Sequence, residues 1–292
     1  MCVLLSIQMA PLIADRCQTL VEMLGDYADT NKSVEVFRTF GKLTMETIIA
    51  AAFGHLIDIQ RGESDQLVQA AQLILGNVTE GRQLAIENIV LLLSNFPFVE
   101  PLLRYRASRS KAAVAYQSIC EVALSLIHTR RESPNKQSYK DLLQLMIDAT
   151  AEDKGEQRRL TNEEIFSQCF VFIAAGYETT ANALTYTAYL LALNPDIQEK
   201  LIGQIMEYFA AHPDVSVYDM AQELTYLDMV VQESLRLYPP VPQTSRHCNE
   251  TAHIGDVVIP KGAQVTIPIW HIHHSAEHWS DPETFDPERY TN

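Results

Sequence analysis

The sequence contains few glycines and few basic residues, and both shortages narrow the classes of protein that fit it. Only 11 of its 292 residues are glycine, and no two glycines lie two positions apart, so the dinucleotide-binding pattern G-x-G-x-x-G cannot occur. Lysine and arginine total 22 against 37 acidic residues, which gives a formal net charge of −15. Because this charge repels phosphate backbones, we expect no nucleic-acid partner.

Cysteine is also scarce, and no stretch has the composition of a typical membrane span. The five cysteines are scattered and form no C-x-x-C pair, which argues against a disulfide framework and against a zinc knuckle. The most apolar stretch, residues 165–193, carries Glu178 near its middle, and a carboxylate in the bilayer would cost about 2.5 to 3.5 kcal/mol. We therefore expect a buried helix there, in a chain without an anchor of its own.

Helical periodicity dominates the sequence up to about residue 237. The expected fold class is therefore mainly α. The long helix over 165–193 is expected to start at a capping box formed by Thr161 and Glu164 and to be the central element. The other helices are expected over residues 3–24, 34–53, 67–79, 101–131, 195–211 and 224–237.

After residue 240 the pattern changes from helical to alternating. Two apolar runs over residues 252–259 and 263–269, joined by Pro260-Lys261-Gly262, predict a small β hairpin. The polar run over residues 152–159 predicts only a break between two helices.

The histidines near residue 275 include one motif associated with zinc. His274, Glu277 and His278 spell H-x-x-E-H, which binds zinc in one group of metallopeptidases. Such a site needs a helix that presents both imidazoles, and a third ligand from elsewhere. Prolines on both sides leave little room for a helix. A solvated turn is the ordinary interpretation, and a zinc hydrolase stays open as an alternative.

The middle of the central helix carries an unusual group of residues. Gly176 is a poor helix former, and Glu178 and Thr179 follow it in an otherwise apolar stretch. A glycine lets another group approach the backbone closely, and a threonine hydroxyl can bond to an earlier carbonyl and bend the helix. An acid beside a hydroxyl in such a notch could relay protons to a bound molecule. A kinked helix with a solvated glutamate is the alternative interpretation.

Three motifs follow one another along the chain in a distinctive order. They are A-G-x-E-T-T over residues 175–180, E-x-x-R over 233–236 and F-D-P-E-R-Y over 285–290. In this order and spacing they resemble the cytochrome P-450 haem-thiolate monooxygenases. The stretches most similar to the drug-oxidising and thromboxane-synthase branch lie over residues 141–148, 194–201, 226–231 and 277–285.

The resemblance covers nearly the whole chain and implies the fold and the site of that family. The fold would be one partial domain over residues 1–292, helical over 1–240 and with a small β region over 241–292. Glu178 and Thr179 would be catalytic, with Thr179 holding a water for proton delivery and Glu178 helping to supply protons. Haem b would be the cofactor, bound by Ala175, Gly176 and Arg246, the last through a propionate.

Two further sets of residues take their roles from the resemblance. The substrate pocket would be lined by Val171, Ala174, Val241 and Thr244. A buried ion-pair triad with a structural role would be formed by Glu233, Arg236 and Arg289.

Several of the family's features would lie outside these residues. Its iron ligand is a cysteine that follows the position of Tyr290, so we expect the thiolate beyond Asn292, with no metal ligand in this chain and no activity of the chain by itself. Its membrane anchor would precede residue 1 in a longer protein. That protein is expected on the cytosolic face of the endoplasmic reticulum membrane, with an NADPH-dependent reductase as partner and an apolar, lipid- or drug-like substrate.

The leading function is therefore insertion of one oxygen atom from dioxygen into an apolar substrate. The second is a haem isomerase of the thromboxane-synthase kind, whose pattern has an apolar residue in place of the hydroxyl after the helix acid. Thr179 favours the monooxygenase. Outside haem chemistry, the zinc hydrolase and a non-catalytic helical binding protein stay open.

Overall fold

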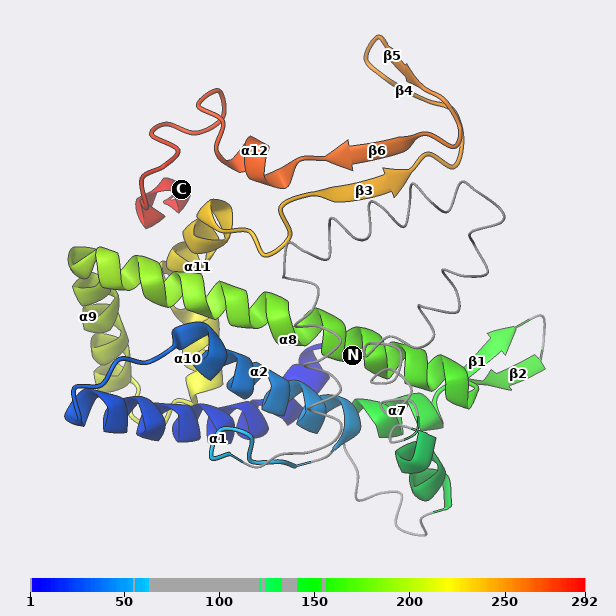
Figure 1. Ribbon diagram of the computed structural model, residues 1–292, viewed down its shortest axis with the longest axis horizontal. Coiled ribbons are helices and arrows are strands. Elements are labelled where there is room, and N and C mark those ends of the chain that lie inside the picture. Colours follow the sequence, from blue (N-terminus) through cyan, green and yellow to red (C-terminus); the bar gives the residue numbers. More distant parts are fainter. Residues whose placement is uncertain are drawn as a thin grey trace, which may run out of the picture. The chain divides into compact units, whose positions relative to one another are not determined.

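The computed structural model describes residues 2–54, 56–62, 121, 124–132, 141–153 and 156–291 (Figure 1). Helices dominate these residues, and most of the short antiparallel strands lie toward the C-terminus, so the predicted mainly α class is confirmed. The chain divides into two compact units, Met1–Glu178 and Thr179–Asn292, and the boundary falls inside one helix. The predicted helix over 67–79 and most of the one over 101–131 lie outside the described residues.

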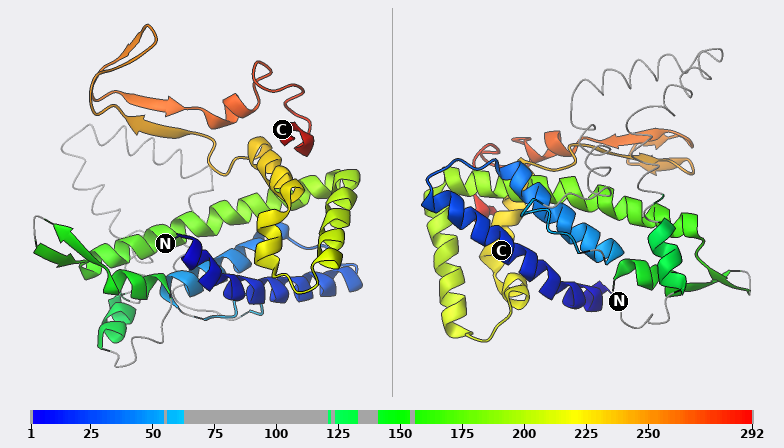
Figure 2. Two further views of the ribbon diagram at one scale, coloured as in Figure 1. Left: turned by 180° about the vertical axis from the view of Figure 1, so that it is seen from behind. Right: turned by 60° about the horizontal axis from the view of Figure 1, so that its bottom comes forward.

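The first unit contains α1 (Cys2–Asp29), α2 (Val36–Phe53), α7 (Leu142–Asp148) and the first part of α8 (Asn162–Leu193). The helices predicted over 3–24 and 34–53 are confirmed, and α1 continues beyond its predicted end. α1 and α2 lie side by side (Figure 2). Residues four apart share one face of a helix, and such residues of α2 and α8 contribute to the core of the first unit. They are Met45, Ile49, Phe53, Ile165, Cys169 and Ile173.

Both ends of α8 have a defined chemical cause. The Thr161 amide donates to Glu164 Oε2 at 2.8 Å, and the Glu164 amide donates to Thr161 Oγ1 at 3.2 Å, so the predicted capping box is confirmed. At the other end, Asn194 Nδ2 donates to the Leu190 carbonyl at 2.8 Å. The following Pro195 has no amide hydrogen to continue the ladder. The 32 residues between these caps are helical without interruption.

A hairpin precedes α8 where the sequence predicts only a break. Strands β1 (Thr150–Asp153) and β2 (Glu156–Arg159) pair antiparallel. The prediction was incomplete because this polar run lacks the alternation of apolar and polar residues by which a half-buried strand is found.

The second unit contains α9 (Pro195–Ala211), α10 (Val217–Glu223), α11 (Thr225–Leu237) and the 3-10 helix η2 (Pro287–Tyr290). The helices predicted over 195–211 and 224–237 are confirmed. The short α10 was not predicted, although Ser216 caps it by accepting the Asp219 amide at 3.1 Å. The second core is formed by Leu190, Leu201, Tyr226, Met229, Val230, Leu237 and Phe285.

The strands of the second unit do not pair as predicted. β4 (Ala252–Ile254) pairs with β5 (Val257–Ile259), and β3 (Thr244–His247) pairs with β6 (Gln264–Ile267), which leads into the short helix α12 (Ile269–His273). The predicted pairing of run 252–259 with run 263–269 is therefore wrong. The first run folds back on itself at Gly255, whose φ of 58° suits a two-residue hairpin turn. The second run pairs instead with β3, a strand that was not predicted.

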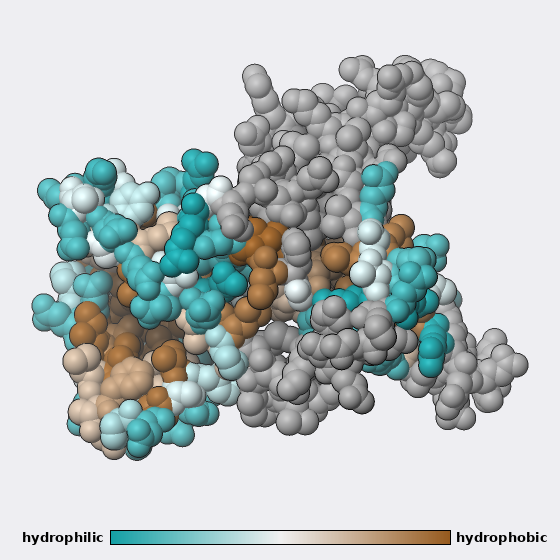
Figure 3. Space-filling view, turned by 90° about the horizontal axis from the view of Figure 1, so that it is seen from below, coloured by the Kyte–Doolittle hydropathy of each residue, from teal (hydrophilic) through white to brown (hydrophobic). Residues whose placement is uncertain are grey.

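Some apolar side chains stay at the surface. On α8, Val171 is 54% exposed and Leu193 is 60% exposed. Figure 3 shows apolar residues between hydrophilic ones on one face of the described residues. None of the described helices combines the length and the hydropathy that crossing a membrane would require.

Candidate functional site

The predicted catalytic residues lie on the central turn of α8, and the helix continues through them without a break. Gly176 does admit a close neighbour, as the sequence predicts. A Cβ added to it would lie 2.9 Å from Ile48 Cδ1, so the approaching group is a side chain of α2. Helix packing thus accounts for this glycine, and its contact with haem stays a prediction.

Glu178 and Thr179 are both half-buried at this turn. Burial raises the pKa of the Glu178 carboxyl, and no cation among the described residues offsets that effect. The pKa of the adjacent Tyr177 is raised by burial and by the charge of Glu178. A carboxyl that keeps its proton to higher pH is suited to donating it, which is the chemistry expected of Glu178.

The predicted pocket residues are divided between the two units. Val171 and Ala174 lie on α8 in the first unit, and Val171 is exposed. Val241 and Thr244 lie in the second unit, where Val241 is exposed and Thr244 begins β3. Ala175, predicted to contact haem, is exposed on the same turn as Gly176. The shared pocket therefore stays a prediction.

Arg246 presents a charge that is not neutralised within the described part of the chain. It lies on β3 opposite Val265, and its side chain is exposed. Its guanidinium donates to Thr244 Oγ1 at 3.0 Å and to the Ser245 carbonyl at 2.9 Å, both uncharged acceptors. An anionic group such as a carboxylate could therefore bind there.

The structure brings Glu233, Arg236 and Arg289 together. Arg236 donates to both carboxylate oxygens of Glu233, from Nε to Oε2 at 2.8 Å and from Nη2 to Oε1 at 2.9 Å. Arg289 Nε donates to Oε1 at 3.1 Å, and the Asp286 amide donates to the same oxygen at 3.0 Å. The Glu233 side chain is 0% exposed. One buried carboxylate thus joins α11 to the segment that contains η2.

The two guanidiniums also bind backbone carbonyls on either side of this centre. Arg236 Nη1 donates to the His273 carbonyl at 2.8 Å, and Arg289 Nη2 donates to the Asp281 carbonyl at 2.8 Å. The Arg236 guanidinium also lies 5.1 Å from the ring centroid of Trp279. The cluster therefore holds the loop after α12 against α11.

The H-x-x-E-H segment follows α12 and is not helical. Both ring nitrogens of His274 already have partners, Nδ1 with Glu283 Oε1 at 2.9 Å and Nε2 with the Leu237 carbonyl at 3.1 Å. In the described residues there is no group of three or more His, Cys, Asp or Glu side chains arranged to hold a metal ion. His274 acts here as a link between segments.

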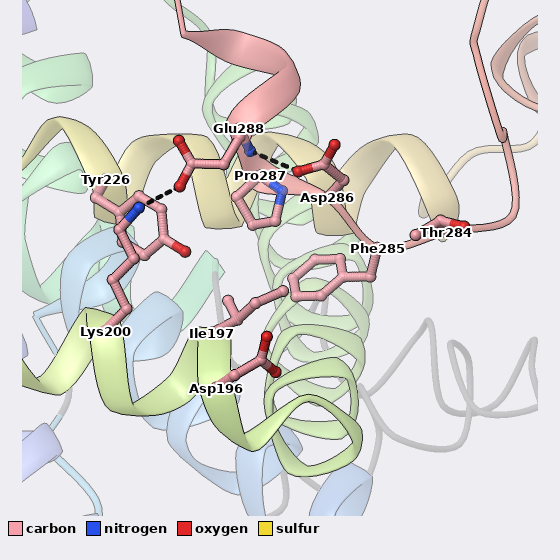
Figure 4. A pocket seen from close by; sticks show the side chains of 9 residues that line it. All are labelled: Asp196, Ile197, Lys200, Tyr226, Thr284, Phe285, Asp286, Pro287 and Glu288. Carbon is pink, nitrogen blue, oxygen red and sulfur yellow. Dashed lines mark hydrogen bonds and ion pairs between the residues drawn. The ribbon is translucent and has the colours of Figure 1, made fainter.

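A surface hollow of about 340 Å³ lies beside the triad in the second unit. Figure 4 shows Lys200 of α9 reaching Glu288 of η2 across it, while Asp286 accepts the Glu288 amide at 3.1 Å. The Lys200 ammonium also lies 4.4 Å from the ring centroid of Tyr226. Because the ion pair of Lys200 and Glu288 joins α9 to η2, the hollow marks the junction of these two elements.

The first unit contains a second buried ion pair that sequence analysis missed. Arg130 Nη1 donates to Asp141 Oδ2 at 2.9 Å, and Nη2 donates to the Phe53 carbonyl at 3.0 Å. Asp141 Oδ1 accepts the Gln144 amide at 2.9 Å, so the same carboxylate caps α7. Its only signal in the sequence was an aspartate in front of an apolar helical run.

The described residues fit one side of a haem better than they fit its iron ligand. The free charge of Arg246 suits a propionate, and the half-buried pair Glu178 and Thr179 suits proton delivery. In the haem-thiolate proteins that the motifs resemble, the iron would be held by a deprotonated cysteine. Burial raises the pKa of Cys169 to about 12, and the Cys248 thiol donates to the Glu250 carbonyl at 2.8 Å. The buried Cys169 thiol is therefore unsuited to act as a thiolate ligand.

Comparison with known proteins identifies a family that the chain matches and several similar proteins. A family model described as Cytochrome P450 matches residues 3–292. Similar proteins include Cytochrome P450 3A27 of Oncorhynchus mykiss, 33% identical over 290 residues, and Cytochrome P450 3A7 of Homo sapiens, 33% identical over 288 residues. Cytochrome P450 3A41 of Mus musculus is 34% identical over 289 residues. These alignments cover 97% of this chain but only 54% or 55% of each relative, so the chain spans just over half their length.

Proposed function

Because this chain belongs to the cytochrome P450 family, we propose that the protein carrying it is a haem-thiolate monooxygenase. Membership implies haem iron as the cofactor, and bound haem supplies the activation of dioxygen. One oxygen atom would enter an apolar, lipid- or drug-like substrate, and the other would leave as water after uptake of two protons and of two electrons from an NADPH-dependent reductase. The observation that carries this proposal is the family match over residues 3–292.

Glu178 and Thr179 are the proposed proton-delivery pair. Because burial raises the pKa of Glu178, its carboxyl holds a proton closer to neutral pH than an exposed carboxyl does. The Thr179 hydroxyl would hold the water that receives this proton. The presence of a hydroxyl at this position supports the monooxygenase over the isomerase.

The other proposed roles concern binding and support. Arg246 would hold a haem propionate, with Ala175 and Gly176 beside the ring. The shared carboxylate of Glu233 would fix the haem-side scaffold through Arg236 and Arg289. The substrate pocket would be lined by Val171, Ala174, Val241 and Thr244.

We further propose that residues 1–292 belong to one domain of this kind. The complete protein would act at the cytosolic face of the endoplasmic reticulum membrane.

The test uses enzyme expressed from the complete reading frame that carries these residues, supplied with haem and reductase. Thr179→Ala is expected to lower the oxygenated product formed per electron by about tenfold or more, because a positioned acid or base contributes about 10² to 10⁴ in rate. Hydrogen peroxide release should rise correspondingly while substrate affinity stays the same. Thr179→Ser keeps the hydroxyl and should retain most of the yield, and Thr180→Ala is the matched neighbour control.

Two results would contradict the proposal. Equal yields from the parent enzyme and Thr179→Ala would remove the proton-delivery role. A rearranged product formed without any electron consumption would identify the isomerase instead.

A further inference from the structure

Two glycines, one on each helix, let α2 and α8 approach each other closely in the first unit. A Cβ on Gly176 would lie 2.9 Å from Ile48 Cδ1 and 3.1 Å from its Cγ1. A Cβ on Gly41 would lie 3.4 Å from Tyr177 Cε2 and 3.5 Å from its Oη. Each helix thus receives a side chain of the other against its own backbone. Both glycines weaken a helix interior relative to alanine, so the close approach is the compensating gain.

A directional bond joins the two helices at the same place. Thr44 is 5% exposed, and its hydroxyl lies 3.0 Å from the Tyr177 carbonyl and 3.2 Å from the Gly41 carbonyl of its own helix. A carbonyl oxygen has two lone pairs, so that of Tyr177 can accept Thr44 and still serve its own helix. The surrounding apolar contacts of Met45 and Ile49 are not directional. The bond from Thr44 to Tyr177 therefore fixes the position along α8 at which α2 packs against it.

We propose that these five residues, Gly41, Thr44, Ile48, Gly176 and Tyr177, form a clamp that positions the proton-delivery turn of α8. Thr44 and Ile48 are positioning residues, because they touch the helix backbone directly before Glu178. This inference rests on the proposed function. A proton donor works only within hydrogen-bond reach of its target, and a displacement of about 1 Å can cost about 10² in rate.

The first test removes the bond between the helices and keeps the shape of the side chain. Thr44→Val should lower product per electron about threefold or more at saturating substrate, and Thr44→Ser should restore it. Thr47→Val is the matched control, since the Thr47 hydroxyl donates at 2.8 Å only to Leu43 of its own helix. The control should leave product per electron unchanged.

A second readout on the same variants does not depend on activity. Amide hydrogen exchange over residues 178–184 should be about fivefold faster in Thr44→Val than in Thr47→Val, which corresponds to about 1 kcal/mol at 1.4 kcal/mol per tenfold. Equal exchange in the two variants would overturn the clamp. Faster exchange with unchanged product per electron in an active enzyme would overturn the positioning role.

The second test uses the glycine and the side chain that fills its space. Gly176→Ala should reduce product per electron because Ile48 must move, and the double variant Gly176→Ala/Ile48→Ala should recover most of it. Gly203→Ala is the control, since nothing lies within 4 Å of an added Cβ there. Failure of the double variant to recover would overturn the role of Ile48. A parent enzyme that forms no oxygenated product would overturn the proposed function, and the exchange measurement would still decide the clamp.

Discussion

Both units of the structure bury an ion pair, but they build it differently. In the second unit, the Glu233 carboxylate is shared by two guanidiniums and one backbone amide. In the first unit, Asp141 pairs with Arg130 and caps a helix, while the guanidinium also binds the Phe53 carbonyl. The side chains of Arg130 and Asp141 are 7% and 8% exposed, whereas that of Glu233 is 0% exposed.

A carboxylate that is shared by two guanidiniums should therefore contribute more to the free energy of unfolding than one that pairs with a single guanidinium. Removing Glu233 leaves the buried Arg236 and the half-buried Arg289 without the carboxylate that they share. Removing Asp141 leaves one guanidinium that keeps a backbone carbonyl. Breaking a buried pair is costly mainly because of the charge left behind.

The largest expected effect comes from removing the two carboxylates. Glu233→Ala should lower the free energy of unfolding by about 3 to 5 kcal/mol. Asp141→Ala should lower it by about 2 to 3 kcal/mol, through one charged hydrogen bond and the cap of α7. Urea unfolding of both variants measures the difference. Equal losses, or a larger loss at Asp141, would break the comparison.

An effect no larger than that of Asp141→Ala is expected at Gly54, which lies against the Arg130–Asp141 pair. Gly54 ends α2 with a φ of 60°, and a Cβ there would lie 2.1 Å from Asp141 Oδ2. Gly54→Ala should cost about 2 to 3 kcal/mol, from backbone strain and displacement of the pair. Gly62→Ala is the control, because its φ is 103° but nothing lies within 4 Å of an added Cβ. If thermal unfolding shifts both variants equally, the ion pair does not require the glycine.

The smallest effect is expected at Glu178, a half-buried carboxyl without a guanidinium partner among the described residues. Burial raises its pKa above the ordinary value, so the folded state favours the protonated form. The stability that this form contributes is present at low pH and is lost as the pH rises through the raised pKa. Relative to the parent, Glu178→Gln should therefore gain stability as the pH rises above about 4, the ordinary range of a carboxyl pKa. A difference in unfolding temperature that does not change with pH would contradict this.

Local sequence signals predicted the ends of helices better than the pairing of distant strands. The ends of α8 followed from Thr161, Glu164 and Pro195, because caps and prolines act on neighbouring residues. The pairing of β6 with β3 did not follow, because strands of alternating residues can pair with several partners. Gly255 was a local turn signal that could have indicated the correct hairpin.

The candidate site divides in the same way. Motif order in the sequence indicated Glu233, Arg236 and Arg289, and the structure places them in contact. Nothing in the sequence connected Arg130 with Asp141, since the residue types do not distinguish a buried ion pair from one at the surface. Their burial depends on Phe53 and Gly54, which come from a distant part of the chain.

By itself, the sequence determined the longer described helices, the capping box of α8 and the polar turn at Gly176, Glu178 and Thr179, because these depend on residues within a few positions of one another. Only the tertiary structure decided that Ile48 fills the space beside Gly176 and that Thr44 bonds to Tyr177, 133 residues away. The raised pKa of Glu178 also depends on the tertiary structure, because it results from burial. Which groups lose water depends on segments that meet only when the chain folds.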